Sequence, residues 1–215
     1  MGSTRLPGKV LKTIGDEPLL THVLHRLKLL RHKAIIVVAT TDQSQDDVIE
    51  EYCQNLDVLC FRGSEKNVLQ RYYLCAVEYG LDHIVRLTAD NPFTDIDELD
   101  GLIQMHLNTE SDFSHSFASL PIGVGAEVFT FNALKESYEQ GHEAHHLEHV
   151  DEYMLEHPEL FDTHIYQAAV SKGYPEIRLT VDTMEDYKKA CLIVESFGSS
   201  LVSVEEAIQF CLRSA

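Results

Sequence analysis

The sequence predicts a single α/β domain with a mostly parallel sheet covered by helices on both faces. A continuous, largely β-branched run at 34–39 (AIIVVA) is typical of a strand buried on both faces. Apolar residues at helical spacing precede it over Pro18–His32, where the proline suits the first turn. Strand-like and helix-like segments then alternate with short connections, which favours a parallel sheet. Ligands of such sheets bind where loops leave the carboxyl ends of the strands.

The remaining elements follow in order. Up to about residue 110 we expect strands at Val58–Phe61 and Asp82–Thr88, with helices at Asp46–Asn55, Asn67–Tyr79 and Asp95–Leu107. Beyond it we expect strands at Asp112–Phe117, Ala126–Phe131, Thr163–Tyr166 and Ile177–Val181, a helical stretch at His142–His157, and helices at Met184–Phe197 and Ser203–Arg213. No linker interrupts the chain, so residues 1–215 form one domain in which 110–170 is a small β/helical arm.

The start of the chain departs from this pattern. A doubly wound domain ordinarily opens with a buried strand, whereas this chain opens with the loop Met1–Lys9 (MGSTRLPGK). We therefore expect the first strand to be missing from its usual place. It comes either from elsewhere in the chain or from upstream of Met1, which would then be an internal methionine.

Length, charge and cysteine content narrow the class of protein. A chain of 215 residues buries a core without disulfides or metal. Its five cysteines form no CxxC pair and follow no signal peptide, which favours reduced thiols and a cytoplasmic location. The net charge of −18 argues against nucleic acid and anionic membranes as partners. Residues 1–33 instead carry seven Lys/Arg against two Asp/Glu, a basic island that suits a nucleotide.

The opening loop has the composition of a phosphate-binding loop. Gly2 and Ser3 offer close backbone approach and a hydroxyl donor, and Arg5 and Lys9 offer two cations. The spacing differs from GxxxxGK[ST], so the loop is not a Walker A motif. A flexible terminal tail is the alternative interpretation of this segment.

Two similar pentapeptides supply candidate metal ligands. RLTAD and RLTVD end at Asp90 and Asp182, each at the end of a predicted strand. Two carboxylates that converge at the edge of the sheet would hold Mg²⁺, which prefers oxygen ligands and bridges substrate phosphates. Taken singly, Asp182 also suits a helix N-terminus and Asp90 a turn.

A competing pattern lies at 142–146 (HEAHH), which matches the HExxH motif of zinc hydrolases. That chemistry needs His142 and His146 on one face of a buried helix, together with a third ligand. Gly141 directly before His142 places the motif at a helix start, so we expect a surface helix terminus rather than a zinc centre.

Taken together, the motifs resemble those of the cytidylyltransferase superfamily, and most closely those of the spore coat polysaccharide biosynthesis protein F family, which is related to the acylneuraminate and Kdo cytidylyltransferases. The matching segments occur in order along the chain: MGSTRLPGK (1–9), VVATTD (37–42), FRGSE (61–65), RLTADNP (86–92), EVF (127–129), EHV (148–150) and RLTVDTMED (178–186). The resemblance implies a Rossmann-like nucleotidyltransferase fold, CTP as donor, Mg²⁺ as cofactor and a homodimer formed through the arm.

The resemblance also implies a role for each matched residue. Arg5 and Lys9 would be catalytic, neutralising charge on the triphosphate, and Asp90 and Asp182 would hold the metal. The nucleotide would contact Gly2, Ser3, Arg5, Lys9, Asp42, Arg62, Gly63 and Ser64, although ordinary turn chemistry also explains the last four. The sugar would contact Glu127, His149 and Arg178.

Two features depart from the family pattern: an apolar strand ending in Gln-Ala-Arg is absent before Met1, and Gly125 stands where relatives carry an aspartate. The predicted activity is transfer of a CMP group from CTP to a sugar or sugar acid, with release of pyrophosphate, for surface polysaccharide or glycan synthesis. The alternatives are a nucleotide-binding protein of the same fold without turnover and, more distantly, a zinc hydrolase.

Overall fold

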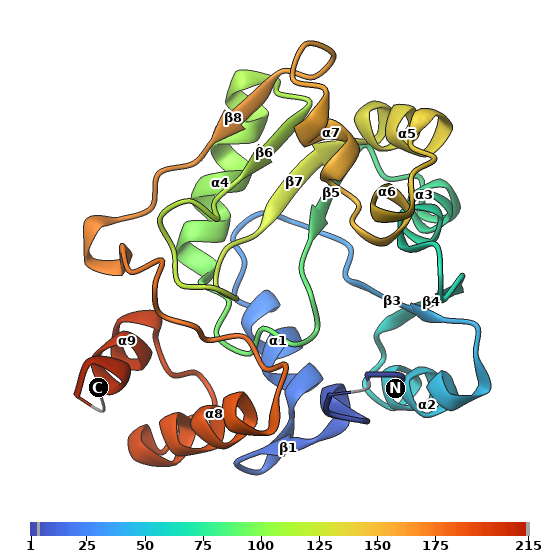
Figure 1. Ribbon diagram of the computed structural model, residues 1–215. Helices are drawn as coiled ribbons and strands as arrows, with labels where there is room; N and C mark the ends of the chain where they lie inside the picture. Colours follow the sequence, from blue (N-terminus) through green and yellow to red (C-terminus); the bar gives the residue numbers. More distant parts are fainter. Residues whose placement is uncertain (4, 214–215) are drawn as a thin grey trace.

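The computed structural model describes residues 1–3 and 5–213, and it has the predicted α/β architecture. Its strands form three groups (Figure 1). The strands are β1 (Thr13–Ile14) with β2 (Glu17–Pro18), β3 (Val37–Thr41) with β4 (Leu59–Gly63), and β5 (His83–Arg86), β6 (Phe113–His115), β7 (Glu127–Thr130) and β8 (Thr163–Ile165).

The four-stranded sheet has the order β5-β7-β6-β8. β7 runs antiparallel to both of its neighbours, so β5, β6 and β8 share one direction, and β3 and β4 are parallel to each other. The expectation of a mostly parallel sheet is confirmed, with β7 as the reversed strand. Because β7 is reversed, its first residue, Glu127, lies at the same edge as the last residues of β5 and β6, Arg86 and His115.

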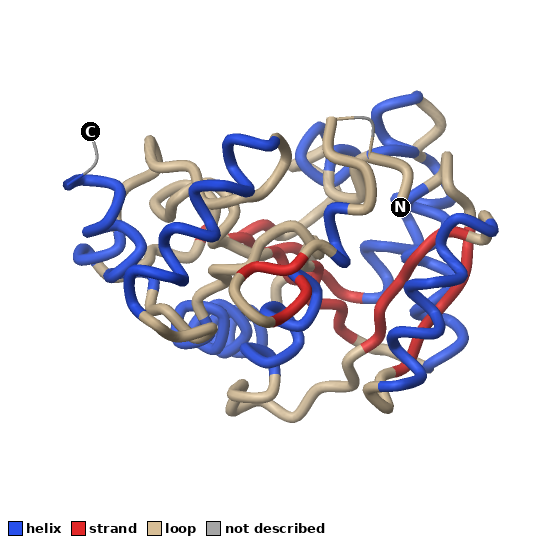
Figure 2. Tube along the Cα trace, turned by 90° about the horizontal axis from the view of Figure 1, so that it is seen from below, coloured by secondary structure: helices blue, strands red, loops and turns tan. Residues whose placement is uncertain are grey.

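Helices cover both faces of the four-stranded sheet, because successive apolar side chains of β7 point to opposite faces. Val128 packs with Leu99, Leu102 and Ile103 of α4, whereas Phe129 packs with Leu134 and other residues on the opposite face. Figure 2 shows the helices arranged around the strands. The helices are α1 (Leu19–Leu27), α2 (Asp47–Asn55), α3 (Val68–Tyr79), α4 (Ile96–Thr109), α5 (Phe131–Gln140), α6 (Ala144–Glu148), α7 (Glu152–Glu156), α8 (Met184–Phe197) and α9 (Val204–Arg213), with short 3₁₀ turns at Lys9–Leu11, Ser44–Asp46 and Val170–Lys172.

Two expected elements differ in the structure, and helix α5 is additional to the expected ones. The helical stretch His142–His157 is divided into the short helices α6 and α7. The expected strand at Ile177–Val181 forms only an isolated bridge, between Ile122 and Arg178. Its backbone bonds go to an irregular turn and to Asp90 rather than to a regular strand, so no ladder forms.

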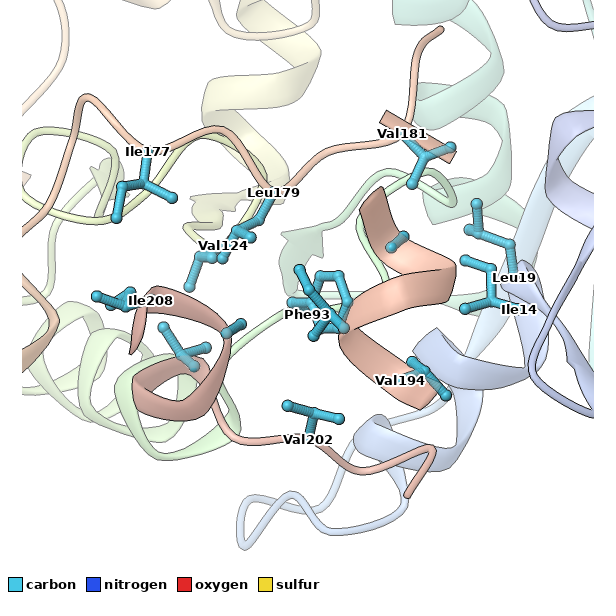
Figure 3. Close-up of a cluster of buried hydrophobic side chains, with 14 of the residues drawn as sticks. Ile14, Leu19, Phe93, Val124, Ile177, Leu179, Val181, Val194, Val202 and Ile208 are labelled. Atoms are coloured by element: carbon cyan, nitrogen blue, oxygen red, sulfur yellow. The ribbon is translucent and has the colours of Figure 1, made fainter. Parts of the chain in front are cut away.

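That 177–181 segment nevertheless lies in a core of its own. Ile177, Leu179 and Val181 alternate inward and pack against Phe93 and residues of α8 and α9, as Figure 3 shows. The period-2 pattern that predicts a strand is therefore real, but here it reflects an extended segment buried beneath two helices. This core anchors the segment that carries Asp182.

The sheet is interrupted between β3 and β5. Within the described part of the chain, β3 pairs only with β4 and β5 only with β7. A cavity of about 920 Å³ lies between them, lined largely by apolar side chains that include Val23, Val38 and Ile84. The interruption is consistent with the expectation that the doubly wound sheet lacks one strand.

Candidate functional site

The opening loop forms a compact turn that presents Lys9. Leu6 is buried in the core and the Ser3 hydroxyl accepts a hydrogen bond from the Leu6 amide at 3.3 Å. Gly8 adopts φ +67°, a conformation that favours glycine, and directly precedes the turn at Lys9–Leu11. Thr4 of the motif lies outside the described residues. Residues 1–3 and 5–9 thus belong to a folded loop, which favours the loop interpretation over the flexible tail.

Lys9 lies between the two predicted metal ligands. Its Nζ donates to Asp90 Oδ2 at 2.5 Å and to Asp182 Oδ1 at 2.9 Å, and the Lys9 side chain is only 14% exposed. Arg5 Nη2 lies 3.3 Å from the same Asp182 oxygen, but the rest of its side chain is largely exposed. The structure therefore brings together four residues that the sequence separates by up to 177 positions.

The backbone contributes to this convergence. The amide of Val181 donates to the carbonyl of Asp90 at 2.9 Å. This bond joins the two RLTxD segments next to their aspartates, Asp90 and Asp182. Asp90 itself lies in a turn after β5, closed by the bond from the Asn91 amide to the Thr88 carbonyl. The two carboxylates are therefore neighbours because their main chains are bonded to each other.

Asp182 is held by the start of α8. Thr183 caps this helix by accepting from the Asp186 amide, and Asp186 accepts from the amides of Asp182 and Thr183. Arg178 donates to the carboxylates of both Asp182 and Asp186. Burial opposes the charge of Asp182, but hydrogen bonds from Lys9 and Arg178 outweigh it and lower the pKa of this carboxyl group. These contacts therefore favour the ionised form of Asp182.

The predicted nucleotide-contacting residues lie side by side at the ends of β3 and β4, where Arg62 and Gly63 belong to the strand rather than to the expected turn after it. The Asp42 amide donates to the Gly63 carbonyl at 2.8 Å, and the Ser64 hydroxyl accepts from the Asn67 amide at the start of α3. Arg62 points along α2, where its guanidinium pairs with Asp47 at 2.8 Å and Glu50 at 2.7 Å. A nucleotide would have to compete with these carboxylates for Arg62, and its contact with Arg62 stays a prediction.

Glu127, the first residue of β7, lies in a buried cluster with Arg86, at the end of β5. Its side chain is 0% exposed; one oxygen accepts from Arg86, while Oε2 lacks a hydrogen-bond partner among the described residues. Arg86 also lies 3.8 Å from Asp151. Burial raises the pKa of Glu127 to about 8; Arg86 opposes the increase and Asp151 adds to it. A fully buried carboxyl group with an unpaired oxygen can accept a hydrogen bond from a ligand when ionised or donate one when protonated.

Sequence reasoning missed Arg86 and Asp151 as partners of Glu127. Arg86 stood in the first RLTxD segment, but nothing local linked it to a residue 41 positions away. Strand pairing makes the link, since Arg86 and Glu127 are partners in the β5–β7 register. Of the other predicted sugar contacts, His149 is exposed beside the cavity between β3 and β5, whereas Arg178 lies with Asp182.

The HExxH interpretation is wrong in this structure. His142 is exposed and precedes α6, whereas His146 is buried and its Nε2 lies 2.8 Å from Glu156. Within residues 1–3 and 5–213, the one group of side chains close enough to share a metal is His145, His146 and Glu156. His142 does not belong to it, so a zinc hydrolase built on His142 and His146 is ruled out.

Within the same described ranges, no helix is both long and apolar enough to span a membrane. The five cysteines are all free.

The fold and the loop with its paired carboxylates define an α/β nucleotidyltransferase. A family model described as cytidylyltransferase matches residues 1–211, and the chain belongs to this family. The spore coat polysaccharide biosynthesis protein SpsF of Bacillus subtilis is 36% identical over 220 residues, covering 100% of this chain and 91% of SpsF. An uncharacterised protein of Methanocaldococcus jannaschii is 38% identical over 209 residues, covering 97% and 86% of the two chains.

Solved structures agree. A cytidylyltransferase from Leptospira borgpetersenii superposes with a TM-score of 0.92 at 33% identity, covering 100% of this chain and 91% of that one. A CMP-2-keto-3-deoxy-manno-octonic acid synthetase complexed with CTP shares the fold, with a TM-score of 0.68 at 16% identity over 91% of this chain and 95% of that one. The predicted family, fold and enzyme class are confirmed.

Proposed function

We propose that the protein transfers a CMP group from CTP to a sugar acid or related sugar in an Mg²⁺-dependent reaction that releases pyrophosphate. The convergence of Lys9, Asp90 and Asp182 carries this proposal. A loop with two cations beside two carboxylates contains the groups that nucleotidyl transfer needs: oxygen ligands for a metal and positive charge for the leaving group. Homology supports the donor and the acceptor class.

Asp90 and Asp182 would hold the Mg²⁺. The fit is good because both groups are carboxylates, both remain partly accessible, and both already contact a single cation, the Lys9 ammonium. When bound there, Mg²⁺ neutralises phosphate oxygens of the donor. Asp186 and Arg178 keep Asp182 in place for this role.

Arg5 and Lys9 would stabilise the negative charge that grows on the leaving pyrophosphate. The Arg5 side chain is 66% exposed, so its guanidinium can turn toward a triphosphate at little cost. Lys9 is less exposed and would release its carboxylates as the metal and the triphosphate arrive. No covalent nucleophile on the protein is required, because the acceptor hydroxyl itself attacks the α-phosphate.

Glu127, His149 and Arg178 would contact the acceptor sugar, with Arg86 and Asp151 as positioning partners of Glu127. Relatives named 3-deoxy-manno-octulosonate cytidylyltransferase and 8-amino-3,8-dideoxy-manno-octulosonate cytidylyltransferase match part of the chain at 25–33% identity. They favour a sugar acid as acceptor, and SpsF favours a role in surface polysaccharide synthesis.

The test measures pyrophosphate release with each of the four ribonucleoside triphosphates, Mg²⁺ and a panel of sugars and sugar acids. CTP with one acceptor should give turnover, and Asp90→Asn and Asp182→Asn should each remove most of it. Asp97→Asn is the matched control, because this carboxylate is 80% exposed on α4. Tight CTP binding without turnover on any acceptor would instead identify a nucleotide-binding protein of the same fold.

A further inference from the structure

The histidine-rich segment contains a cluster that the proposed transfer reaction does not use. Nε2 of His145 and Nε2 of His146 each lie 2.8 Å from a different oxygen of the Glu156 carboxylate. One ligand atom from each of the three residues lies within 4.8 Å of the other two. Two imidazoles and one carboxylate therefore converge on a volume small enough for one ion.

Two short helices build this cluster. His145 and His146 belong to α6 and Glu156 ends α7, and the link between the helices, 149–151, is short. His146 is 5% exposed and meets the Tyr153 ring edge-on at a centroid distance of 5.4 Å, so its imidazole is fixed by packing. His145 and Glu156 are exposed and can adjust by small rotations. One ligand is thus pre-positioned and two are adaptable.

We propose that His145, His146 and Glu156 form a Zn²⁺ site that clamps α6 to α7. Two neutral imidazoles with one carboxylate are an established type of ligand set for zinc, which prefers four ligands and would take water at its open position. Mg²⁺ prefers oxygen ligands and does not compete effectively for two imidazoles. The site is therefore chemically distinct from the Asp90–Asp182 pair.

The hydrogen bonds show what metal binding must rearrange. The Glu143 amide donates to Nδ1 of His146 at 3.3 Å, so Nε2 of His146 carries the proton and donates to Glu156. Zinc binding at Nε2 moves this proton to Nδ1, and the long bond from Glu143 is given up.

The clamp lies next to the expected acceptor region. Asp151, in the link between α6 and α7, is 3.8 Å from Arg86, the partner of Glu127. Holding the two helices together therefore restricts the segment that carries His149 and Asp151. Zinc binding at this cluster does not depend on the transfer reaction, so the two can be measured separately.

The test titrates Zn²⁺ alone into the full chain, freed of any histidine tag and treated with chelator, and follows heat release. We expect one Zn²⁺ per chain, and His145→Gln, His146→Gln and Glu156→Gln should each weaken binding by about tenfold or more. His142→Gln is the matched control from the same segment and should bind as the wild type does. Glu156 is 45% exposed and glutamine has nearly the same size, so Glu156→Gln changes a metal ligand with little disturbance of the packing.

Cobalt provides a second measurement, because Co²⁺ bound by imidazole and carboxylate lacks the intense ultraviolet absorption of a thiolate complex. Three outcomes overturn the proposal: no saturable binding at one ion per chain, an equal loss in His142→Gln, or full binding in the His145→Gln/His146→Gln double variant. The last outcome, together with thiolate absorption, would assign the metal to the cysteines.

Discussion

Replacing Lys9 with methionine keeps most of the side-chain length but removes the ammonium that joins Asp90 to Asp182. In the metal-free protein this change leaves two carboxylates facing each other without a shared cation. The variant should therefore be less stable than the wild type when no metal is present. It should also bind Mg²⁺ more readily in the absence of nucleotide, because the ammonium no longer competes for the two carboxylates.

The structure sets the size of the effect. An ion pair at about 4 Å is worth roughly 1 kcal/mol in bulk water and roughly 4 kcal/mol at the effective dielectric of a protein surface, before desolvation is subtracted. The three side chains are between 14% and 21% exposed, which places the pairs between solvent-exposed and buried ones. We expect a loss of about 2 kcal/mol in the free energy of unfolding.

Chemical denaturation of wild type and Lys9→Met, each with and without Mg²⁺, measures both effects. At an Mg²⁺ concentration of about 100 times the dissociation constant, binding adds about 2.7 kcal/mol, which would more than restore the variant. The wild type should gain less, because Lys9 must first leave the carboxylates. Lys28→Met, an exposed lysine at the end of α1, is the control. Equal stability without metal, or an equal gain from Mg²⁺ in both proteins, would refute this reasoning.

Three further predictions concern stability. Burial raises the pKa of Glu127 from 4.5 to about 8, so between these pH values the folded state holds a proton that the unfolded state has lost, and stability falls as pH rises. In urea denaturation, Glu127→Gln should flatten that part of the pH profile. Burial, helped by His83, lowers the pKa of His106 from 6.5 to about 4, so stability falls as pH drops below 6.5, and His106→Asn should remove that loss. Phe129→Ala should cost about 3–5 kcal/mol, whereas Leu192→Ala at an exposed position should cost much less; similar losses would contradict the assigned core.

Local sequence patterns predict most elements, because the spacing of apolar residues matches the side of each helix or strand that is buried. The helices α3, α4 and α8 begin within one residue of the expected positions, and each begins with a capping side chain, Asn67, Asp95 or Thr183. Helix α5 is not among the expected elements, because the expected strand runs to Phe131 and no helical pattern is assigned after it. The hydroxyl of Thr130 accepts from the Ala133 amide, so a capping signal was present.

Other features could not follow from local patterns. The partnership of Arg86 with Glu127 depends on the register between β5 and the reversed strand β7. A single sequence shows that both segments are strands, but not which residues face each other. The same limit applies to Glu156 and the two histidines, which lie together only because the chain turns between α6 and α7. Sequence adjacency instead drew attention to His142 and His146, which do not meet.

The paired RLTxD segments show how a correct inference can rest on an incorrect local structure. Their similarity predicts two strand ends that present carboxylates at one edge of the sheet. Only the first segment begins in a strand, at the end of β5. In the second segment, Asp182 lies between an isolated bridge at Arg178 and the N-cap of α8, Thr183. The carboxylates converge for a different reason: the Val181 amide bonds to the Asp90 carbonyl, and Lys9 then joins the two side chains. A substitution of Asp186, whose carboxylate accepts from the amides of Asp182 and Thr183, should therefore affect the proposed metal site as strongly as one in the opening loop, because the position of Asp182 depends on the helix start rather than on the sheet.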